Sequence, residues 1–218
     1  LIVVPRANVL ALNANERRTP GEEDAFSDLN RQFPVDEAPR TDLARSLWSL
    51  VELHEPDLIL DLHEGYDYHR INDDSVGSSV ITDQSESSIA LGRSVVGAID
   101  ATIGDETKRF SLLGPPVAGG LTRAANAHHE IAVMILETTK KGQAAAFRAR
   151  QHRLMVHVVL SELDMATHGP DVMVGTAGDD GDIAVATYVS GGVSGSGPDR
   201  LEMLLDEPRG FDFRRVCA

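Results

Sequence analysis

Two apolar runs of the sequence are each followed by side chains that could do chemistry. The run LIL at 58–60 leads into Asp61, His63 and Glu64, and the run AVMIL leads into Glu137. In open α/β sheets, ligands bind beyond the carboxyl ends of the strands. If both runs are parallel, neighbouring strands, an imidazole and a carboxylate emerge at the same edge of the sheet. The plainer interpretation of Glu137 is a solvated strand end.

The stretch DLHEGYDYHR contains both histidines that could bind a metal beside the first strand. Asp61 lies two residues before His63 and therefore on the same side of the strand. Its carboxylate can hold one imidazole nitrogen and so orient the ring as a metal ligand. His69 falls in the following loop, where a surface or substrate-contacting histidine is more common than a ligand.

An early polar segment, SDLNRQFP, carries Asn30 and Arg31 next to each other. Together they offer a fork of hydrogen-bond donors that suits a carboxylate. The alternative is a helix cap or a structural salt bridge. Arg17 and Arg18 add positive charge to the same part of the chain.

The pattern of apolar residues predicts alternating strands and helices, which is typical of an α/β sandwich with a mainly parallel or mixed sheet. We expect strands at 1–5, 57–63, 79–82, 109–113 and 131–139, and helices at 38–54, 86–103, 121–128 and 143–168. Phe147, Leu154 and Val158 are the predicted inward residues of the last helix. The segment 6–37 reads as a long polar loop, and 169–218 as a small β-rich module or tail.

The composition excludes several classes of partner and cofactor site. The net charge of −14 repels nucleic acid and anionic lipid, so neither is an expected partner. The single cysteine excludes a disulfide framework and a cysteine-clustered zinc site. No apolar run approaches the roughly 18 residues of a membrane span. A lysine-poor, acidic chain is typical of the cytoplasm of a high-salt organism, although an ordinary acidic enzyme is the simpler alternative.

Three motifs in order, DLNRQFP, DLHE and ILETT, resemble the zinc carboxypeptidase superfamily. The closest branch is the succinylglutamate desuccinylase/aspartoacylase family, and the resemblance covers about residues 1–140. It implies a three-layer α/β sandwich with a central mixed, mainly parallel sheet and one zinc ion per chain. The catalytic domain would comprise 1–168, with 169–218 as the tail.

The resemblance also implies roles for individual residues. His63 matches a zinc ligand, with Asp61 behind it, and Glu137 matches the glutamate that activates water and protonates the leaving amine. Zinc with an open coordination position lowers the pKa of its bound water toward about 7, and a nearby carboxylate can move the proton.

The remaining predicted residues would contact the substrate. Asn30 and Arg31 match the family's substrate-carboxylate clamp, and Arg17 or Arg18 matches the arginine that polarises the scissile carbonyl. His69 and Arg70 are candidate contacts to the acyl or side-chain end.

The family's first zinc motif, H-x-x-E, occurs nowhere in the 218 residues. The forms at His54 and His168 are H-x-x-D and come too late in the family's order. Because LIVVPRAN reads as a strand already under way, we expect two further ligands upstream of Leu1, together with a missing N-terminal strand and ligand loop. The loop GPPVAGG also lacks the tyrosine of carboxypeptidases proper, which favours the deacylase branch.

The sequence therefore predicts zinc-dependent hydrolysis of an amide bond in a small carboxylate-bearing substrate, such as an N-acyl amino acid or a short peptide. The alternative is a non-catalytic carboxypeptidase-like binding protein with an incomplete metal site. Glu137 argues against this alternative, because a binding protein has no need of a water-activating base. A third possibility is an unrelated α/β domain in which the motifs are coincidental.

Overall fold

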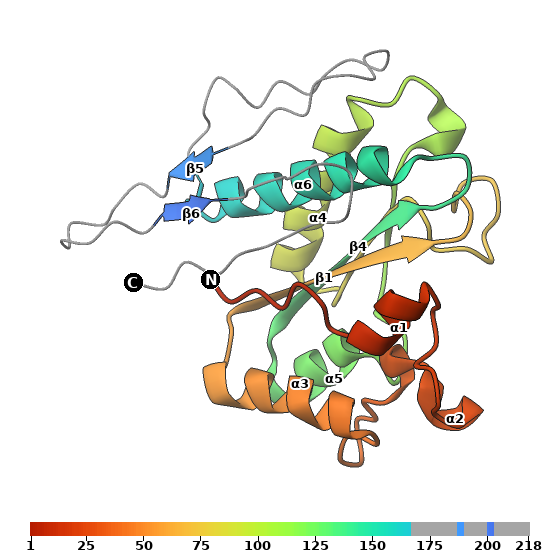
Figure 1. Ribbon diagram of the computed structural model, residues 1–218. Helices are drawn as coiled ribbons and strands as arrows, with labels where there is room; N and C mark the ends of the chain where they lie inside the picture. Colours follow the sequence, from red (N-terminus) through yellow and green to blue (C-terminus); the bar gives the residue numbers. More distant parts are fainter. Residues whose placement is uncertain (167–186, 190–199, 203–218) are drawn as a thin grey trace.

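A mixed four-stranded sheet forms the centre of the computed structural model, which describes residues 1–166, 187–189 and 200–202 (Figure 1). The strand order is β1-β4-β2-β3. β1 (Leu58–Gly65) pairs in parallel with β4 (Ala132–Thr139), and β2 (Ser79–Thr82) pairs in parallel with β3 (Ser111–Leu113). Between these two parallel pairs, β4 and β2 run antiparallel. The predicted mixed, mainly parallel sheet is confirmed.

Helices cover both faces of this sheet, which gives the predicted three-layer sandwich (Figure 1). On one face lie α3 (Asp42–His54) and α5 (Leu121–His129), and on the other lie α4 (Glu86–Asp100) and α6 (Ala145–Glu162). Val133 of β4 packs with Val51 of α3, whereas Met134 packs with Met155 of α6. The side chains of β4 thus alternate between two apolar layers, as the period of a strand requires.

The N-terminal prediction was wrong in part. Residues 1–8 form no strand, and the first regular element is α1 (Val9–Ala14). Leu1 and Ile2 are 73% and 55% exposed. A strand is stable only when its backbone groups find a partner strand, and this segment pairs with none of the described strands. Apolar composition alone therefore predicted a strand that has no place in the sheet.

The segment 6–37 also differs from the long loop that its polar composition suggests. It contains the short helices α1 and α2 (Asp24–Ser27) and the 3-10 turn η1 (Leu29–Arg31). Asn8 begins α1 by accepting a hydrogen bond from the backbone N–H of Ala11, at 3.0 Å. Local capping of this kind can form helical turns without a long apolar stripe.

The other elements agree with the prediction to within a few residues, except at the last helix. α6 begins at Ala145 and ends at Glu162, before Asp164 takes a left-handed backbone conformation. Of the predicted inward residues, Leu154 and Val158 are partly buried and pack against the core beside the fully buried Met155 and Val159. Phe147 is 37% exposed, so its predicted inward position was wrong. None of the helices among the described residues has the length and hydropathy of a bilayer-spanning segment.

Beyond residue 166 the structure describes two short strands. β5 (Thr187–Val189) and β6 (Arg200–Glu202) form an antiparallel pair, in agreement with a β-rich C-terminal segment. The apolar stretch DVMVGT at 171–176, in the same predicted β-rich tail, lies outside the described residues. A short 3-10 turn, η2 (Glu106–Lys108), completes the elements before β3.

Candidate active site

His63 and Glu137 are direct register partners at the carboxyl ends of β1 and β4. The predicted arrangement of two parallel, neighbouring strands is therefore confirmed. Ile59 and Val133, which have the same parity, belong to the apolar layer under α3 and α5. Because strand side chains alternate, His63 and Glu137 are placed on that face as well. An imidazole and a carboxylate thus meet at one edge of the sheet.

The His63 ring is held by Asp61, whose Oδ2 lies 2.9 Å from Nε2. Both side chains are about one quarter exposed, at 27% each. Burial lowers the pKa of His63, but the charge and hydrogen bond of Asp61, with the charge of Glu137, outweigh it and raise the pKa to about 9. The three groups therefore form one electrostatically coupled cluster.

Glu137 is almost completely enclosed, with 6% of its surface exposed. Its Oε2 has no hydrogen-bond partner among the described residues. Burial is the main reason that the pKa of Glu137 is raised to about 7, with Asp61 and Glu64 adding to the effect and His63 and Arg17 opposing it. A carboxylate with a free oxygen and a pKa near neutrality is suited to accept and return a proton.

The donor set at this edge fits one position of a zinc site. A histidine paired with a carboxylate is the usual arrangement around a zinc ligand, and His63 with Asp61 has it. However, no three histidine, cysteine, aspartate or glutamate side chains of the described residues converge so as to hold a metal. A zinc site needs three or four protein ligands. The described part of the chain would therefore supply one ligand and not a complete centre.

The structure distinguishes the two neighbouring arginines. The charge of Arg17 acts on the pKa of both His63 and Glu137, and its Nη2 lies 3.0 Å from Oδ2 of Asp28. Arg18 instead donates to the carbonyl oxygen of Asp24 and to Ser27 Oγ. Arg17 is thus the arginine that is electrostatically coupled to the histidine–glutamate pair, whereas Arg18 stabilises the turn at α2.

Asn30 and Arg31 form the turn η1, against which the loop before α5 packs closely. A Cβ atom at Gly120 would lie 2.8 Å from Asn30 Oδ1, and one at Gly119 would lie 3.2 Å from the Arg31 Cα. Gly119 also has a φ of +81°, which disfavours other residues. The two glycines allow this close approach, while the Arg31 side chain is exposed and donates to the Asn30 carbonyl oxygen, at 2.6 Å.

His69 and Arg70 make contacts away from the His63–Glu137 pair. His69 Nδ1 lies 2.8 Å from the Ser75 carbonyl oxygen, within the loop after β1. Arg70 donates to the Phe110 carbonyl oxygen at 2.9 Å and lies 3.8 Å from Asp100 of α4. Neither contacts His63 or Glu137 in a hydrogen bond or ion pair of the described residues. Their predicted substrate contacts stay predictions.

Three residues near the pair were missed by sequence reasoning. Asp28 pairs with Arg17, and its position two residues before Asn30 in the motif could have suggested a role. Thr138 and His152 contact each other on the opposite face of the sheet, with 3.1 Å between Oγ1 and Nε2. No local pattern marks this contact, because it depends on how α6 crosses the sheet.

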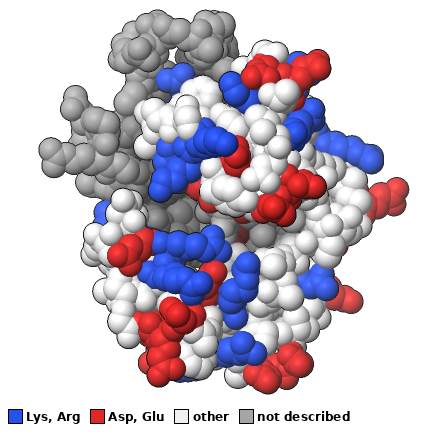
Figure 2. Space-filling view, turned by 90° about the vertical axis from the view of Figure 1, so that its right-hand side faces the viewer, with Lys and Arg blue, Asp and Glu red and all other residues white. Residues whose placement is uncertain are grey.

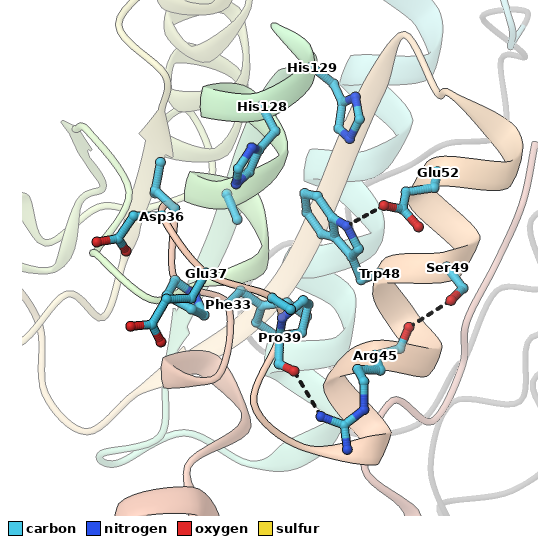
Figure 3. A pocket seen from close by; sticks show the side chains of 14 residues that line it. Phe33, Asp36, Glu37, Pro39, Arg45, Trp48, Ser49, Glu52, His128 and His129 are labelled. Carbon is cyan, nitrogen blue, oxygen red and sulfur yellow. Dashed lines mark hydrogen bonds between the residues drawn. The ribbon is translucent and has the colours of Figure 1, made fainter.

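A surface cavity of about 630 Å³ lies elsewhere, between the 33–39 loop, α3 and α5 (Figure 3). Trp48 forms one wall, with its ring centroid 5.5 Å from those of His128 and His129. Its indole N–H donates to Glu52, at 2.8 Å. None of the predicted catalytic, metal-binding or substrate-binding residues lines this cavity. It is therefore separate from the His63–Glu137 pair.

The surface charge near the strand ends contrasts with the acidic character of the chain. Figure 2 shows the side of the molecule toward which β1 and β4 point in Figure 1. Basic side chains gather around the middle of this side, with acidic side chains among them, although the net charge is −14. Clustered basic side chains can attract anionic ligands.

Comparison with known proteins identifies the fold. No protein-family model matches the sequence, and no curated protein matches it. The Gln46His variant of the cell shape determinant Csd4 from Helicobacter pylori superposes with a TM-score of 0.62 and 21% identity, covering 74% of this chain and 43% of Csd4. Tripeptide-bound Csd4 matches with a TM-score of 0.59 and 20% identity, over the same shares of the two chains.

A proposed metallopeptidase from Shewanella denitrificans is also similar, with a TM-score of 0.51 and 13% identity over 72% of this chain and 58% of that one. Csd4 is described as a D,L-carboxypeptidase. The chain thus has a carboxypeptidase-like fold, as its motifs predicted. It spans less than half the length of Csd4.

Proposed function

We propose that this chain carries part of the active site of a zinc-dependent hydrolase that cleaves an amide bond in a small carboxylate-bearing substrate. The observation that carries the proposal is the register pairing of His63 with Glu137, with Asp61 behind the histidine. Such a pairing brings a ligating ring and a proton-accepting carboxylate to the same strand ends. Packing alone does not explain a buried carboxylate whose Oε2 has no partner among the described residues.

In this proposal the protein residues have distinct tasks. His63 is one zinc ligand, and Asp61 fixes the orientation of its ring. When bound, zinc supplies Lewis-acid polarisation of the scissile carbonyl. Glu137 takes a proton from the attacking water and gives it to the leaving amine, which its free Oε2 and raised pKa support. The two ligands predicted to precede Leu1 stay part of the proposal.

The substrate is held by the N-terminal segment. Arg17 offsets the negative charge that develops on the carbonyl oxygen, which its electrostatic coupling to His63 and Glu137 supports. Asn30 and the exposed guanidinium of Arg31 bind the free carboxylate. The basic side chains in the middle of Figure 2 favour an anionic substrate on this side of the molecule.

Two substrate types fit this site. The loop GPPVAGG, with no tyrosine before Glu137, favours an N-acyl amino acid deacylase. The fold likeness to Csd4, which is described as a D,L-carboxypeptidase, favours a short peptide with a free carboxyl terminus. In both cases water cleaves an amide bond, and the products are a carboxylate and an amine. The alternative remains a binding protein of the same fold.

A substrate panel with zinc tests the proposal. The panel contains N-succinyl and N-acetyl amino acids and short peptides with L- and D-residues at the carboxyl terminus, each beside its carboxamide. We expect turnover of one class, at least tenfold slower for the carboxamide, and about one zinc per chain by metal analysis. Bound zinc and bound carboxylate without turnover of any substrate would favour the binding-protein alternative.

Arg17→Ala and Arg18→Ala form a matched pair for the same assay. Loss of a donor to the developing oxyanion lowers kcat by about 10²–10³-fold, so we expect the kcat of Arg17→Ala to fall by that factor. Arg18→Ala should stay within about threefold of the parent, because Arg18 only donates to the α2 turn. Equal losses in the two variants would contradict the role given to Arg17.

A further inference from the structure

Helix α6 contacts the register pair that immediately follows His63 and Glu137. Glu64 of β1 lies opposite Thr138 of β4. The Arg148 guanidinium binds the Glu64 carboxylate, and the His152 ring lies 3.1 Å from Thr138 Oγ1. Arg148 and His152 are four residues apart, so they lie on the same side of α6, one turn from each other. Two successive turns of one helix thus contact both members of the pair.

The His152 contact is deeply buried. His152 is 7% exposed and Thr138 is completely buried. The ring therefore contacts β4, the strand that carries the predicted base, one residue beyond Glu137. A buried hydrogen bond of this kind is geometrically restrictive, because either group left alone would be unsatisfied.

Arg148 makes the corresponding contact between α6 and β1, through Glu64. Its side chain is 14% exposed, and besides Glu64 it donates to the Gln143 carbonyl oxygen, at 2.6 Å. Gln143 in turn donates to the Tyr68 hydroxyl, at 2.9 Å, in the loop after β1. The start of α6 is therefore tied both to the end of β1 and to the loop that leaves it.

β1 needs such contacts more than β4 does. β4 has a paired strand on each side, whereas β1 pairs only with β4 among the described strands. The backbone of β1 is therefore held by hydrogen bonds to a neighbouring strand on one side only among the described strands. Shifting β1 by one residue would turn His63 away from Glu137. The contacts from Arg148 and His152 of α6 oppose that shift at the carboxyl ends of β1 and β4, next to His63 and Glu137.

We propose that Arg148 and His152 are positioning residues, which hold the ends of β1 and β4 so that His63 and Glu137 stay opposite each other. This inference rests on the proposed function of the pair. Neither residue touches the substrate side of the sheet, because Glu64 and Thr138 have the opposite parity to His63 and Glu137. Their effect is transmitted through the strand backbone, as for residues that orient metal ligands from behind.

The test uses three variants of the buried contact, namely His152→Leu, Thr138→Val and the double variant that combines these two changes. Met155→Ala is measured beside them, and all are studied in the full protein with zinc. Each of the first two removes one partner of the buried contact. Met155 lies one turn further along α6, is completely buried in the apolar core, and has no polar group to contact the strand ends. It serves as a control for a loss of stability alone. The measurements are kcat, KM, the urea midpoint and the backbone amide shifts of β1 and β4.

We expect His152→Leu and Thr138→Val each to lower kcat by about 10–100-fold with KM nearly unchanged, since the Asn30–Arg31 clamp is on the other face. The double variant should lose no more kcat than the less active of the two single variants, because each single change already removes the same contact. His152→Gln, which keeps a side-chain donor, should restore part of kcat. Met155→Ala should lower the urea midpoint but keep kcat within about threefold below that midpoint.

Two results would overturn the inference. One is a loss of kcat in Met155→Ala as large as in His152→Leu at equal stability. The other is unchanged amide shifts at the ends of β1 and β4 in both His152→Leu and Thr138→Val. If the parent protein has no hydrolase activity, the proposed function fails, but the amide shifts still decide whether the α6 contacts position the strand ends.

Discussion

β1 and β4 are parallel neighbours of equal length, yet they have different environments. Seven of the eight residues of β4 are buried, whereas those of β1 are partly or fully exposed. β4 lies between two strands, and β1 lies at an edge of the described sheet. Leu136 of β4 is completely buried, but Leu62, its register partner in β1, is 40% exposed. Most of the buried contacts of this strand pair are therefore made by β4.

The difference indicates how stability and chemistry are divided between the two strands. β4 contributes side chains to the apolar core on both faces and encloses Glu137, which is 6% exposed. β1 contributes the open side, where His63 and Asp61 stay partly accessible. In the proposed function Glu137 is the base, and burial is the main cause of its raised pKa. His63, the proposed zinc ligand, belongs to the more open strand.

The largest expected effects come from the strand-end residues themselves. Glu137→Gln should lower turnover by about 10³-fold, because general acid–base catalysis contributes on that order, while zinc content is kept. His63→Ala should lower turnover at least as much and should also reduce the zinc content, measured by metal analysis. If Glu137→Gln turns over like the parent, the division of tasks between β4 and β1 is wrong.

The register partners Leu136 and Leu62 differ in burial, so replacing them should change the free energy of unfolding by different amounts. Leu136→Ala should lower the free energy of unfolding by about 3–4 kcal/mol, as expected for a large-to-small change in a closed core. Leu62→Ala should cost less than about 1 kcal/mol, because its side chain already contacts water. Urea denaturation of both variants gives the comparison. Similar costs would indicate that β1 is covered as completely as β4.

An effect between those of the two leucine variants concerns the hydrogen bonds that Asp83 accepts at the start of β4. Asp83 Oδ2 accepts hydrogen bonds from the Val133 backbone N–H, at 2.9 Å, and from Ser88 Oγ, at 2.8 Å. Partial burial raises the pKa of Asp83, but hydrogen bonds from Ser85, Val133 and Ser88 outweigh it and hold the pKa below its usual value. Asp83→Asn should therefore lower the free energy of unfolding by about 1–2 kcal/mol at pH 7.

The pH dependence of this effect has a defined sign. Because the pKa of Asp83 is lower in the folded protein than in the unfolded chain, its contribution is present above the usual pKa near 4 and is lost as the pH falls below it. The difference between the parent and Asp83→Asn should thus shrink between pH 5 and pH 2 in urea unfolding. A difference that grows toward acid would contradict the lowered pKa.

Much of the central fold could be predicted from local patterns. The apolar runs at 57–63 and 131–139 became β1 and β4, because short apolar runs bounded by helix ends and turns are typical of strands inside a sheet. The strand at 1–5 was predicted by the same rule and is absent, because a strand also needs a partner. In α6, Leu154 and Val158 pack against the core as predicted, whereas Phe147 in the first turn is exposed. Helical periodicity gives the spacing of buried residues, but the packing partner decides along which turns they are buried.

The sequence by itself determined that an imidazole and a carboxylate end two apolar strands, and that Asp61 stands beside His63, since both follow from residue order and strand period. Only the tertiary structure decided that these strands are register partners and that Arg17, rather than Arg18, is coupled to the pair. It also decided that Arg148 and His152 contact the next register pair. Glu64 and Arg148 are 84 residues apart. Contacts across such separations depend on how helices cross the sheet, which no local pattern encodes.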